Sequence, residues 1–309
     1  MEYAVLNNGI KMPMEGIGTF LLKPAEAEES VYQALKAGYR LVDTANAYMN
    51  EKGVGRGIRK SGVKREDIFL VTKLWPTEYE DGAKAIEDTL KRRGTDYVDL
   101  LILHQPVGNY LAGYHAMEEA YKAGKVKALG LSNFPEKLIQ DVIDHCEIKP
   151  QMVQVEAHPY YPQTELKAYL AKYQMVLMAW YPLGHGDKSL VGEEVFTKLA
   201  QKYGKTNAQI VLRWHVQAGN IIIPGSKNAD HIRDNFNIFD FALTEEEMAE
   251  IAKVDKNTRY YNMSLEDAAK AYMANQIDFN AQEEPRLPQK EPLIRKTSGR
   301  RPEQDRPPM

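Results

Sequence analysis

VDLLILHQPVGNYLAGYHAMEEAYKAGKVKALGLSNF, residues 98–134, is the stretch that decides the fold of this 309-residue chain. Its two ends, 98–104 and 128–132, are short apolar runs with the length of buried strands. Residues 114–123 have the apolar spacing of an amphipathic helix, and Gly124 follows at the place of a C-terminal cap. A strand, a helix and a strand in this order predict two parallel strands joined by a right-handed crossover.

The same unit repeats on both sides of this stretch. Helical patterns include 25–37, 81–92 and 136–145, and Gly38 and Gly94 follow the first two. We expect eight strands, at 16–19, 41–43, 68–73, 98–104, 128–132, 152–156, 176–180 and 221–224. Eight strand–helix units close into a (β/α)8 TIM barrel of the α/β class. An open doubly wound sheet has the same periodicity and is the alternative.

The two ends of the chain differ from this repeat. Asn8-Gly9 lies between two segments of alternating character and predicts an N-terminal β-hairpin over about residues 3–13. From about residue 281 the chain carries six of its sixteen prolines and many charges, a composition that cannot fold alone. We therefore predict one barrel domain with extra helices over 1–280 and an extended C-terminal tail over 281–309. We expect the tail to be solvated, although it could lie on the barrel or on a neighbouring subunit.

Composition narrows the class of function. The formal net charge of −3 provides no basic surface for nucleic acid. The single cysteine, Cys146, excludes an intrachain disulfide framework, and no histidine has zinc-ligand spacing with cysteines. No apolar run approaches the roughly 20 residues that span a bilayer, and the N-terminus has no secretion signal. We expect a soluble, cytoplasmic protein without metal, membrane or nucleic-acid partners, monomeric or weakly homo-oligomeric.

Polar residues follow nearly every predicted strand at its C-terminal end. They are Asp43, Lys73, His104, Ser132, Asn133, Gln154, Glu156, His158, Tyr181 and Ser226. In a barrel these ends converge on one face, where active sites lie, whereas in an open sheet they would spread along an edge. The pattern therefore favours the barrel. We expect His158 to be structural or to lie at the rim of the site.

A tyrosine, a lysine, an aspartate and a histidine in this set have mutually consistent chemistry. A free tyrosine such as Tyr48 has a pKa of about 10 and is a poor proton donor near neutral pH. A lysine ammonium beside it would lower that pKa, and an aspartate would keep the lysine charged and in place. A histidine could orient a carbonyl oxygen and stabilise its developing charge.

Five motifs resemble signatures of the aldo-keto reductase superfamily, including its bacterial diketogluconate-reductase-like and carbonyl reductase members. They are LVDTANAYMNE at 41–51, TKLW at 72–75, LILH at 101–104, GLSNF at 130–134 and IPGS at 223–226. The resemblance runs in order from the hairpin to about residue 260. It implies NAD(P)H-dependent reduction of a carbonyl by hydride transfer from the nicotinamide, with a tyrosine as proton donor. The family's catalytic tetrad falls on Asp43, Tyr48, Lys73 and His104.

The resemblance also implies a cofactor site and a substrate pocket. Ser132, Asn133 and Gln154 match the positions that hold the carboxamide. Tyr181 matches the aromatic residue that stacks on the nicotinamide. The full set of expected cofactor contacts is Thr19, Phe20, Ser132, Asn133, Gln154, Tyr181, Leu183, Gly184, Ser226, Lys227, Asn228, His231 and Asn235. The expected substrate contacts are Phe20, Trp75, His104 and Gln105.

The chain departs from the family pattern where the 2′-phosphate of NADPH binds. Gly225 stands at the usual lysine position and His231 at the usual arginine position, so two strong phosphate ligands are missing. Ser226, Lys227, Asn228 and the amides of a helix N-terminus could still hold a phosphate. We therefore expect NADP(H) binding together with use of NAD(H), or a preference for NADH.

A second departure lies in the substrate pocket, where Gln105 stands at a position that many relatives fill with tryptophan. A smaller, hydrogen-bonding wall favours small polar aldehydes, dicarbonyls or keto sugars. The glycine-rich run at 53–57, Gly-Val-Gly-Arg-Gly, is not a dinucleotide-fold fingerprint. We interpret it as the first turn of a helix packed closely against the barrel.

Two further functions fit the same barrel. It could bind a nicotinamide cofactor as a sensor or regulatory subunit without turnover. It could also be a cofactor-free hydrolase or lyase that uses Glu156 and Asp43. Oxidation of NADPH or NADH on a panel of small carbonyls separates these functions, because only an active reductase consumes the reduced cofactor.

Overall fold

Eight parallel strands lie side by side in chain order in the computed structural model, which describes residues 1–274 and 276–282. They are β3 (Ile17–Gly18), β4 (Leu41–Asp43), β5 (Phe69–Leu74), β6 (Leu100–Leu103), β7 (Leu129–Ser132), β8 (Met152–Glu156), β9 (Val176–Trp180) and β10 (Ile221–Ile222). Gly16 N donates to Ile222 O, and Ile222 N donates to Met14 O, both at 2.9 Å. These bonds close the sheet into the predicted barrel, and the open-sheet alternative is wrong.

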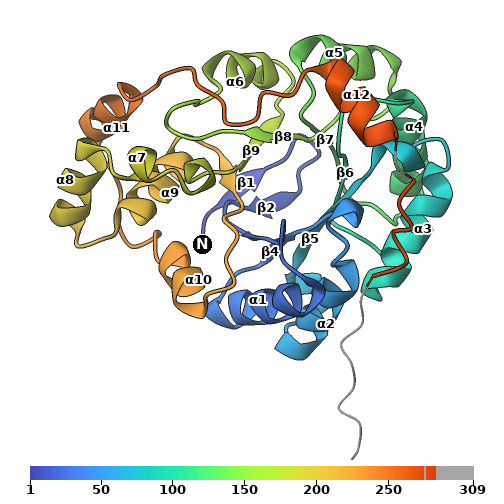
Figure 1. Cartoon of the computed structure of the whole chain (residues 1–309), viewed down its shortest axis with the longest axis horizontal. Coiled ribbons are helices and arrows are strands. Elements are labelled where there is room, and N and C mark those ends of the chain that lie inside the picture. Colours follow the sequence, from blue (N-terminus) through green and yellow to red (C-terminus); the bar gives the residue numbers. More distant parts are fainter. Residues whose placement is uncertain (275, 283–309) are drawn as a thin grey trace, which may run out of the picture.

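Helices surround the barrel (Figure 1). The ring contains α1 (Pro24–Ala37), α2 (Glu51–Ser61), α3 (Gly82–Arg93), α4 (Tyr110–Lys122), α5 (Glu136–His145), α6 (Thr164–Ala171), α9 (Asn207–Gln217) and α10 (Ala229–Phe236). The additional helices are α7 (Lys188–Val191), α8 (Glu194–Tyr203), α11 (Glu245–Ala252) and α12 (Leu265–Met273). Within the described ranges no helix is long and apolar enough to span a membrane.

Glycines end the helices where the sequence predicts. Gly38 follows α1 with φ 112° and Gly94 follows α3 with φ 65°, left-handed conformations that glycine adopts without a Cβ penalty. Gly94 N donates to Lys91 O at 3.1 Å, which satisfies a carbonyl at the end of α3. These caps return the chain toward the next strand.

The barrel interior and the layer beneath the helices form two separate apolar clusters. In β6, Leu100 and Ile102 belong to the inner cluster, whereas Leu101 and Leu103 belong to the outer one. Neighbouring residues of a strand point to opposite faces, so a strand buried on both faces reads as a continuous apolar run. Burial on both faces therefore explains why the strands could be predicted from apolar runs in the sequence.

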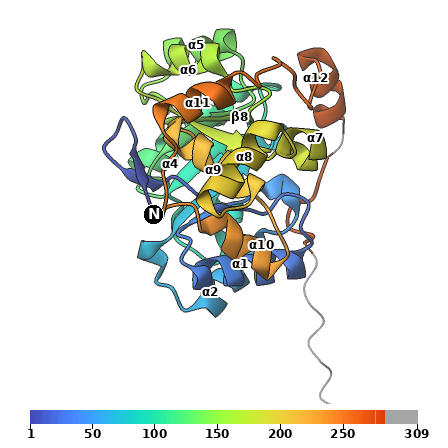
Figure 2. The same ribbon diagram turned by 90° about the vertical axis from the view of Figure 1, so that its left-hand side faces the viewer.

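The predicted hairpin, β1 (Tyr3–Val5) and β2 (Lys11–Pro13), closes one end of the barrel. Leu6 and Met12 are buried in the inner cluster and fill this end. Figure 2 shows the hairpin and α12 at opposite ends of the molecule. Cys146 lies at the hairpin end, directly after α5 and next to Glu147, which shares a surface groove with Asn8 of the hairpin. Access to the interior is therefore from the end where the strands terminate.

The glycine-rich run at 53–57 lies in α2, as predicted, but its close contacts are with neighbouring helices. A Cβ on Gly53 would collide with Pro24 O of α1, and a Cβ on Gly57 would meet Glu28 O of the same helix. A Cβ on Gly55 would collide with Arg93 O at the end of α3. The glycines therefore bring three helix backbones together beside the strands that carry the site. The predicted tail at 281–309 lies almost wholly outside the described residues.

Candidate active site

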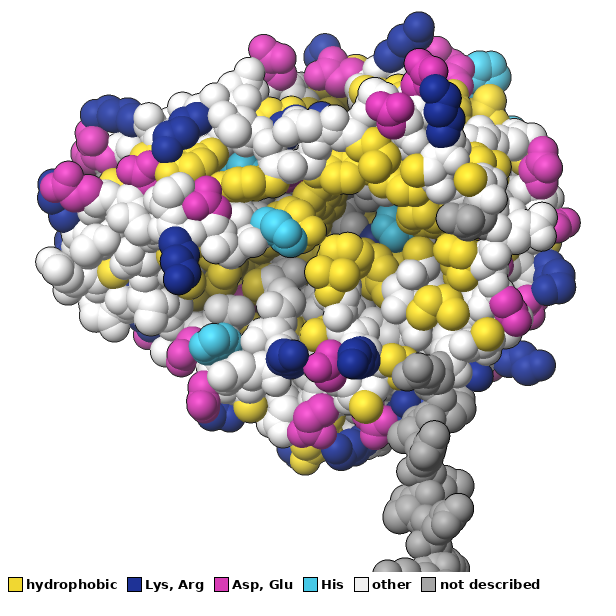
Figure 3. Space-filling view, in the orientation of Figure 1, with side chains coloured by type: hydrophobic (Ala, Val, Ile, Leu, Met, Phe, Trp, Pro, Cys, Tyr) yellow, Lys and Arg dark blue, Asp and Glu magenta, His cyan; other side chains and the backbone are white. Residues whose placement is uncertain are grey.

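The C-terminal ends of the strands surround a hollow in the molecular surface (Figure 3). Figure 3 shows hydrophobic side chains around this hollow and a histidine side chain inside it. Asp43 ends β4, Lys73 lies in β5 and His104 directly follows β6. The barrel thus brings together residues that are up to 61 positions apart in the sequence, which is the arrangement predicted for the catalytic tetrad.

Lys73 is the centre of the polar contacts in this hollow. Its Nζ donates to Asp43 Oδ1 at 2.6 Å, to Thr44 O at 2.9 Å and to the Tyr48 hydroxyl at 3.2 Å. The Lys73 and Asp43 side chains are almost completely buried. The His104 ring lies 5.6 Å from the Tyr48 ring, edge to face. Tyr48, Lys73, Asp43 and His104 therefore form one connected group.

The turn that carries Tyr48 is fixed by the residues that follow it. Tyr48 ends a 3-10 turn, η1 (Asn46–Tyr48), and Met49 then adopts a left-handed φ of 55°. The Asn50 side chain donates to Thr19 O at 2.8 Å and accepts a hydrogen bond from Thr44 Oγ1 at 3.0 Å. Asn50 thus ties this turn to the neighbouring β3 and β4 loops, a role that sequence analysis missed.

Burial controls the protonation states of the site. It raises the pKa of Tyr48 well above its ordinary value, and the negative charge of Asp43 raises it further. The net direction is upward with burial as the largest cause, so the expected lowering by Lys73 does not set the pKa of the resting site. Burial lowers the pKa of Lys73, and the charge of Asp43 offsets part of this effect. The pKa of His104 lies well below its ordinary value because of burial and the charge of Lys73.

The residues expected to hold the carboxamide lie beside the tetrad. The Asn133 side chain donates to His104 O at 3.3 Å and to Ser132 Oγ at 3.2 Å. Gln154 Nε2 donates to Asp43 Oδ2 at 2.9 Å. Thr19 is buried, and its hydroxyl donates to Asp43 O at 3.0 Å. A hydroxyl and two primary amides at the mouth of the barrel are donors and acceptors of the kind that an amide-bearing nicotinamide requires.

The aromatic residues after β9 differ from the expectation in one respect. Tyr181 has a left-handed φ of 53°, and its ring stacks on His185 with centroids 4.2 Å apart. Trp180, the last residue of β9, lies edge-on to Tyr181, and its indole N–H donates to Asn133 Oδ1 at 3.0 Å. Trp180 therefore contacts one of the residues expected to hold the carboxamide. Its place at the end of a strand was the signal that could have found it.

The loop after β9 is held from both sides. Pro182 O contacts the buried His215 Nε2 at 3.1 Å. Asp187 accepts a hydrogen bond from the Tyr260 hydroxyl at 2.6 Å. The expected cofactor contacts Leu183 and Gly184 lie between these two attachments. Their backbone position is therefore defined by contacts outside the loop.

The residues expected at the adenosine end gather at the start of α10. The Asn228 side chain caps this helix by accepting from Asp230 N at 2.8 Å and His231 N at 3.3 Å. Ser226 Oγ accepts from Asn228 N at 3.1 Å. Lys227 Nζ lies 3.2 Å from Glu26 Oε1. The expected Asn235 lies further along α10 and is buried.

Aromatic side chains form the wall of the hollow. The Phe20 ring lies 5.1 Å from Tyr48, and the Trp75 ring lies 5.1 Å from His104. Tyr272 of α12 packs on Trp75 at 4.8 Å and is a residue that sequence analysis missed. Gln105 is buried, and its backbone N–H and carbonyl both bond to the Tyr79 hydroxyl. The wall is therefore more aromatic than the sequence suggested.

Residues 16–256 match the sequence model of the Aldo/keto reductase family. The chain belongs to the aldo/keto reductase family. A glyoxal reductase of Bacillus subtilis is 42% identical to this reductase over 258 residues, covering 82% of this chain and 93% of the relative. A methylglyoxal reductase of Escherichia coli is 38% identical over 257 residues, covering 82% and 94%.

Solved structures agree with this assignment. A Bombyx mori aldo-keto reductase crystallised with NADP superposes with a TM-score of 0.80 and 32% identity, covering 85% of this chain and 95% of that one. This aldo/keto reductase is therefore an NAD(P)H-dependent oxidoreductase that acts on carbonyl compounds, as predicted. The hydrolase or lyase alternative fails on geometry too, because Glu156 is engaged elsewhere: its carboxylate accepts the N–H groups of Tyr260 and Tyr261 and contacts His158.

Proposed function

We propose that this aldo/keto reductase reduces small aldehydes, α-dicarbonyls or keto sugars to alcohols, with Tyr48 as the general acid. The observation that carries the proposal is the pair of contacts at Lys73 Nζ, 2.6 Å to Asp43 and 3.2 Å to the Tyr48 hydroxyl. The names of the similar glyoxal and methylglyoxal reductases support small dicarbonyls as substrates. The buried Gln105 beside His104 supports a site that accepts polar groups.

The chain's own residues supply the proton and stabilise the charge. A bound reduced nicotinamide supplies a hydride to the carbonyl carbon. Tyr48 donates its proton to the carbonyl oxygen, and the Lys73 ammonium stabilises the resulting phenolate. Asp43 keeps Lys73 charged although burial lowers the pKa of the lysine. His104 is neutral because its pKa is strongly lowered, so it orients the carbonyl oxygen as a hydrogen-bond donor.

We infer that the cofactor lies across the mouth of the barrel. Ser132, Asn133 and Gln154 would hold its carboxamide, and Tyr181 with Trp180 would supply the aromatic surface for the ring. Leu183 and Gly184 would lie beside the pyrophosphate. The start of α10 would hold the adenosine end of the cofactor through Ser226, Lys227, Asn228 and His231. Asn235, further along α10, would contribute to the same site. The polar donors already gathered at these positions support this placement.

We further propose that NADH is used as well as NADPH. Lys227 follows Gly225 by two positions, and Glu26 already pairs with it at 3.2 Å. Asp230, in the first turn of α10, adds a negative charge there, and Arg233 pairs with it. A 2′-phosphate would therefore meet little net positive charge, and Gly225 contributes no side chain. The predicted oligomeric state and cytoplasmic location stay predictions.

The test is a kinetic panel with both cofactors, run on the wild type and on Tyr48→Phe. We expect the wild type to oxidise NADPH and NADH with methylglyoxal, glyoxal and small keto sugars, with kcat/KM values within about tenfold between cofactors. Tyr48→Phe should lose about 10²–10⁴-fold in kcat and keep cofactor affinity, because only the proton donor is removed.

Three outcomes would contradict parts of this proposal. Tight cofactor binding without turnover of any carbonyl would identify the chain as a sensor. An active Tyr48→Phe variant would remove Tyr48 from its role. A kcat/KM for NADPH far more than about tenfold above that for NADH would contradict dual cofactor use, but not the proposed carbonyl reduction.

A further inference from the structure

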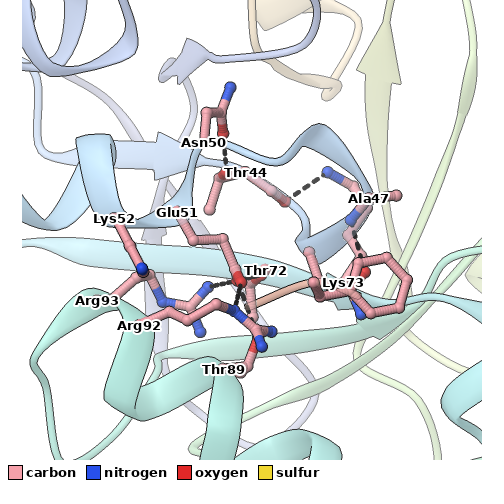
Figure 4. A network of polar contacts seen from close by, with 12 residues as sticks. Thr44, Ala47, Asn50, Glu51, Lys52, Thr72, Lys73, Thr89, Arg92 and Arg93 are labelled. Carbon is pink, nitrogen blue, oxygen red and sulfur yellow. Dashed lines mark hydrogen bonds and ion pairs between the residues drawn. The ribbon is translucent and has the colours of Figure 1, made fainter. Parts of the chain in front are cut away.

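A buried ionic cluster lies directly behind the strand that carries Lys73 (Figure 4). Its centre is Glu51, the first residue of α2, which is completely buried. The Glu51 carboxylate accepts hydrogen bonds from four side chains. The donors are Thr72 Oγ1 at 3.0 Å, Thr89 Oγ1 at 2.9 Å, Arg92 Nε at 2.5 Å and Arg93 Nη1. One carboxylate thus joins α2 to β5 and to α3.

Glu51 is charged in this environment. Burial alone would raise its pKa, but the positive charges of Arg93 and Arg92 outweigh burial and keep the pKa below its ordinary value. A carboxylate that accepts several donors in a buried site holds its partners in fixed positions, because any movement would leave a charge unpaired. The cluster is therefore a rigid connection between these elements.

The connection reaches the catalytic residues through sequence neighbours. Glu51 follows Tyr48 by three positions, and Thr72 directly precedes Lys73. Because successive side chains of a strand point to opposite faces, the Thr72 hydroxyl points to the helix layer while the Lys73 amine points into the barrel. The Thr72–Glu51 bond therefore joins the back of β5 to the start of α2, three positions after Tyr48.

We propose that Glu51 is a positioning residue for the reaction. By binding Thr72 across the back of β5, it sets the distance between the Tyr48 hydroxyl and the Lys73 ammonium. That distance is 3.2 Å, already longer than the usual 2.7–2.9 Å of a strong charge-assisted contact. Further separation would weaken the stabilisation of the phenolate, and displacements of about 1 Å can cost about 10²-fold in rate. This inference rests on the proposed role of Tyr48 as general acid.

Two threonines provide a matched pair of variants. Thr72 and Thr89 are both fully buried, and both donate a hydroxyl hydrogen bond to the same atom, Glu51 Oε1. Thr72 lies in β5, next to Lys73, whereas Thr89 lies in α3, away from the tetrad. Thr89 also accepts a bond from Arg92 at 2.8 Å, so its loss should cost at least as much stability. Thr72→Val and Thr89→Val therefore separate positioning from simple support of the fold.

We expect Thr72→Val to lower kcat about 5–20-fold while the dissociation constant of NADPH stays within about twofold. The solvent deuterium isotope effect on kcat should increase, because proton transfer from Tyr48 becomes more rate-limiting. Thr72→Ser, which restores the hydroxyl, should recover kcat to within about twofold. Thr89→Val should lower the melting temperature and leave both kcat and the isotope effect near the wild-type values.

Equal effects of Thr72→Val and Thr89→Val on kcat would overturn the inference, and so would a Thr72→Val variant that loses only thermal stability. If Tyr48→Phe is inactive in the same assays, this failure concerns Glu51 alone. If Tyr48→Phe is active, the failure lies in the proposed reaction itself.

Discussion

The proton on Tyr48 is retained by burial and by the nearby negative charge of Asp43, which together raise the pKa of the hydroxyl. We therefore expect the hydroxyl to be protonated at neutral pH, and in the proposed reaction it releases its proton only when Lys73 and the developing alkoxide assist. Sequence spacing located Tyr48, Lys73, Asp43 and His104 correctly relative to one another. It could not give the direction of the Tyr48 pKa, because the depth of burial depends on side chains brought from other parts of the chain.

This protonation pattern predicts a broad pH profile for carbonyl reduction. A raised pKa keeps the Tyr48 hydroxyl protonated until the pH rises above the ordinary tyrosine value of about 10. A lowered pKa keeps His104 neutral at every pH above that lowered value. We therefore expect kcat to be nearly constant from about pH 6 to about pH 9 at saturating cofactor. A decline with a midpoint near pH 7 in wild-type kcat would contradict this expectation.

At the scale of elements, strands and capped helices were predictable because their signals are local. Buried strands read as apolar runs, and α1 and α3 end at glycines with positive φ. The position of α12 could not be predicted, because it depends on long-range contacts such as that of Tyr272 with Trp75. Trp180 could have been noticed because it ends a predicted strand, but its contact with Asn133, 47 positions away, could not be predicted.

The three glycines of α2 allow a test of helix packing. Gly55→Ala should lower the melting temperature, although alanine is the better helix former, because the new Cβ would collide with Arg93 O. Gly204→Ala is the control: its φ is 63°, and a Cβ there has open space. The control should cost only the left-handed backbone penalty of about 1 kcal/mol. A Gly55→Ala protein as stable as the wild type would refute the packing argument.

At the scale of the whole molecule, residues 260–274 and 276–282 run along the rim of the barrel mouth (Figure 1), and contacts hold them at both ends. Glu156, at the end of β8, accepts the N–H groups of Tyr260 at 2.5 Å and Tyr261 at 3.1 Å. Beyond α12, Asn280 accepts from Arg92 at 3.0 Å, and Gln282 accepts from Lys52 N at 2.9 Å. Tyr272 is thereby held against the substrate wall. No sequence pattern indicated this, since Glu156 and its partners are more than 100 positions apart.

Weakening the first attachment should loosen this segment. In Glu156→Gln, an NH2 group replaces one carboxylate oxygen. This group cannot accept a backbone N–H, so at least one bond to Tyr260 or Tyr261 is lost. We expect faster amide hydrogen exchange over 260–273 and a severalfold higher KM for the carbonyl, with cofactor affinity retained. Asn280→Ala is the comparison, because it removes only the contact at the other end. Unchanged exchange at 260–273 in Glu156→Gln would show that other contacts hold the segment.

The place of Cys146 at the hairpin end has a consequence for work with reactive carbonyls. Burial raises the pKa of this thiol to about 11, so very little of it is thiolate, the reactive form, at neutral pH. It is the single cysteine of the chain, and it lies at the end of the barrel opposite the mouth. Electrophiles that enter the hollow therefore meet no sulfur nucleophile there. Modification of a thiol is therefore not a route by which such substrates can inactivate the enzyme at its own active site.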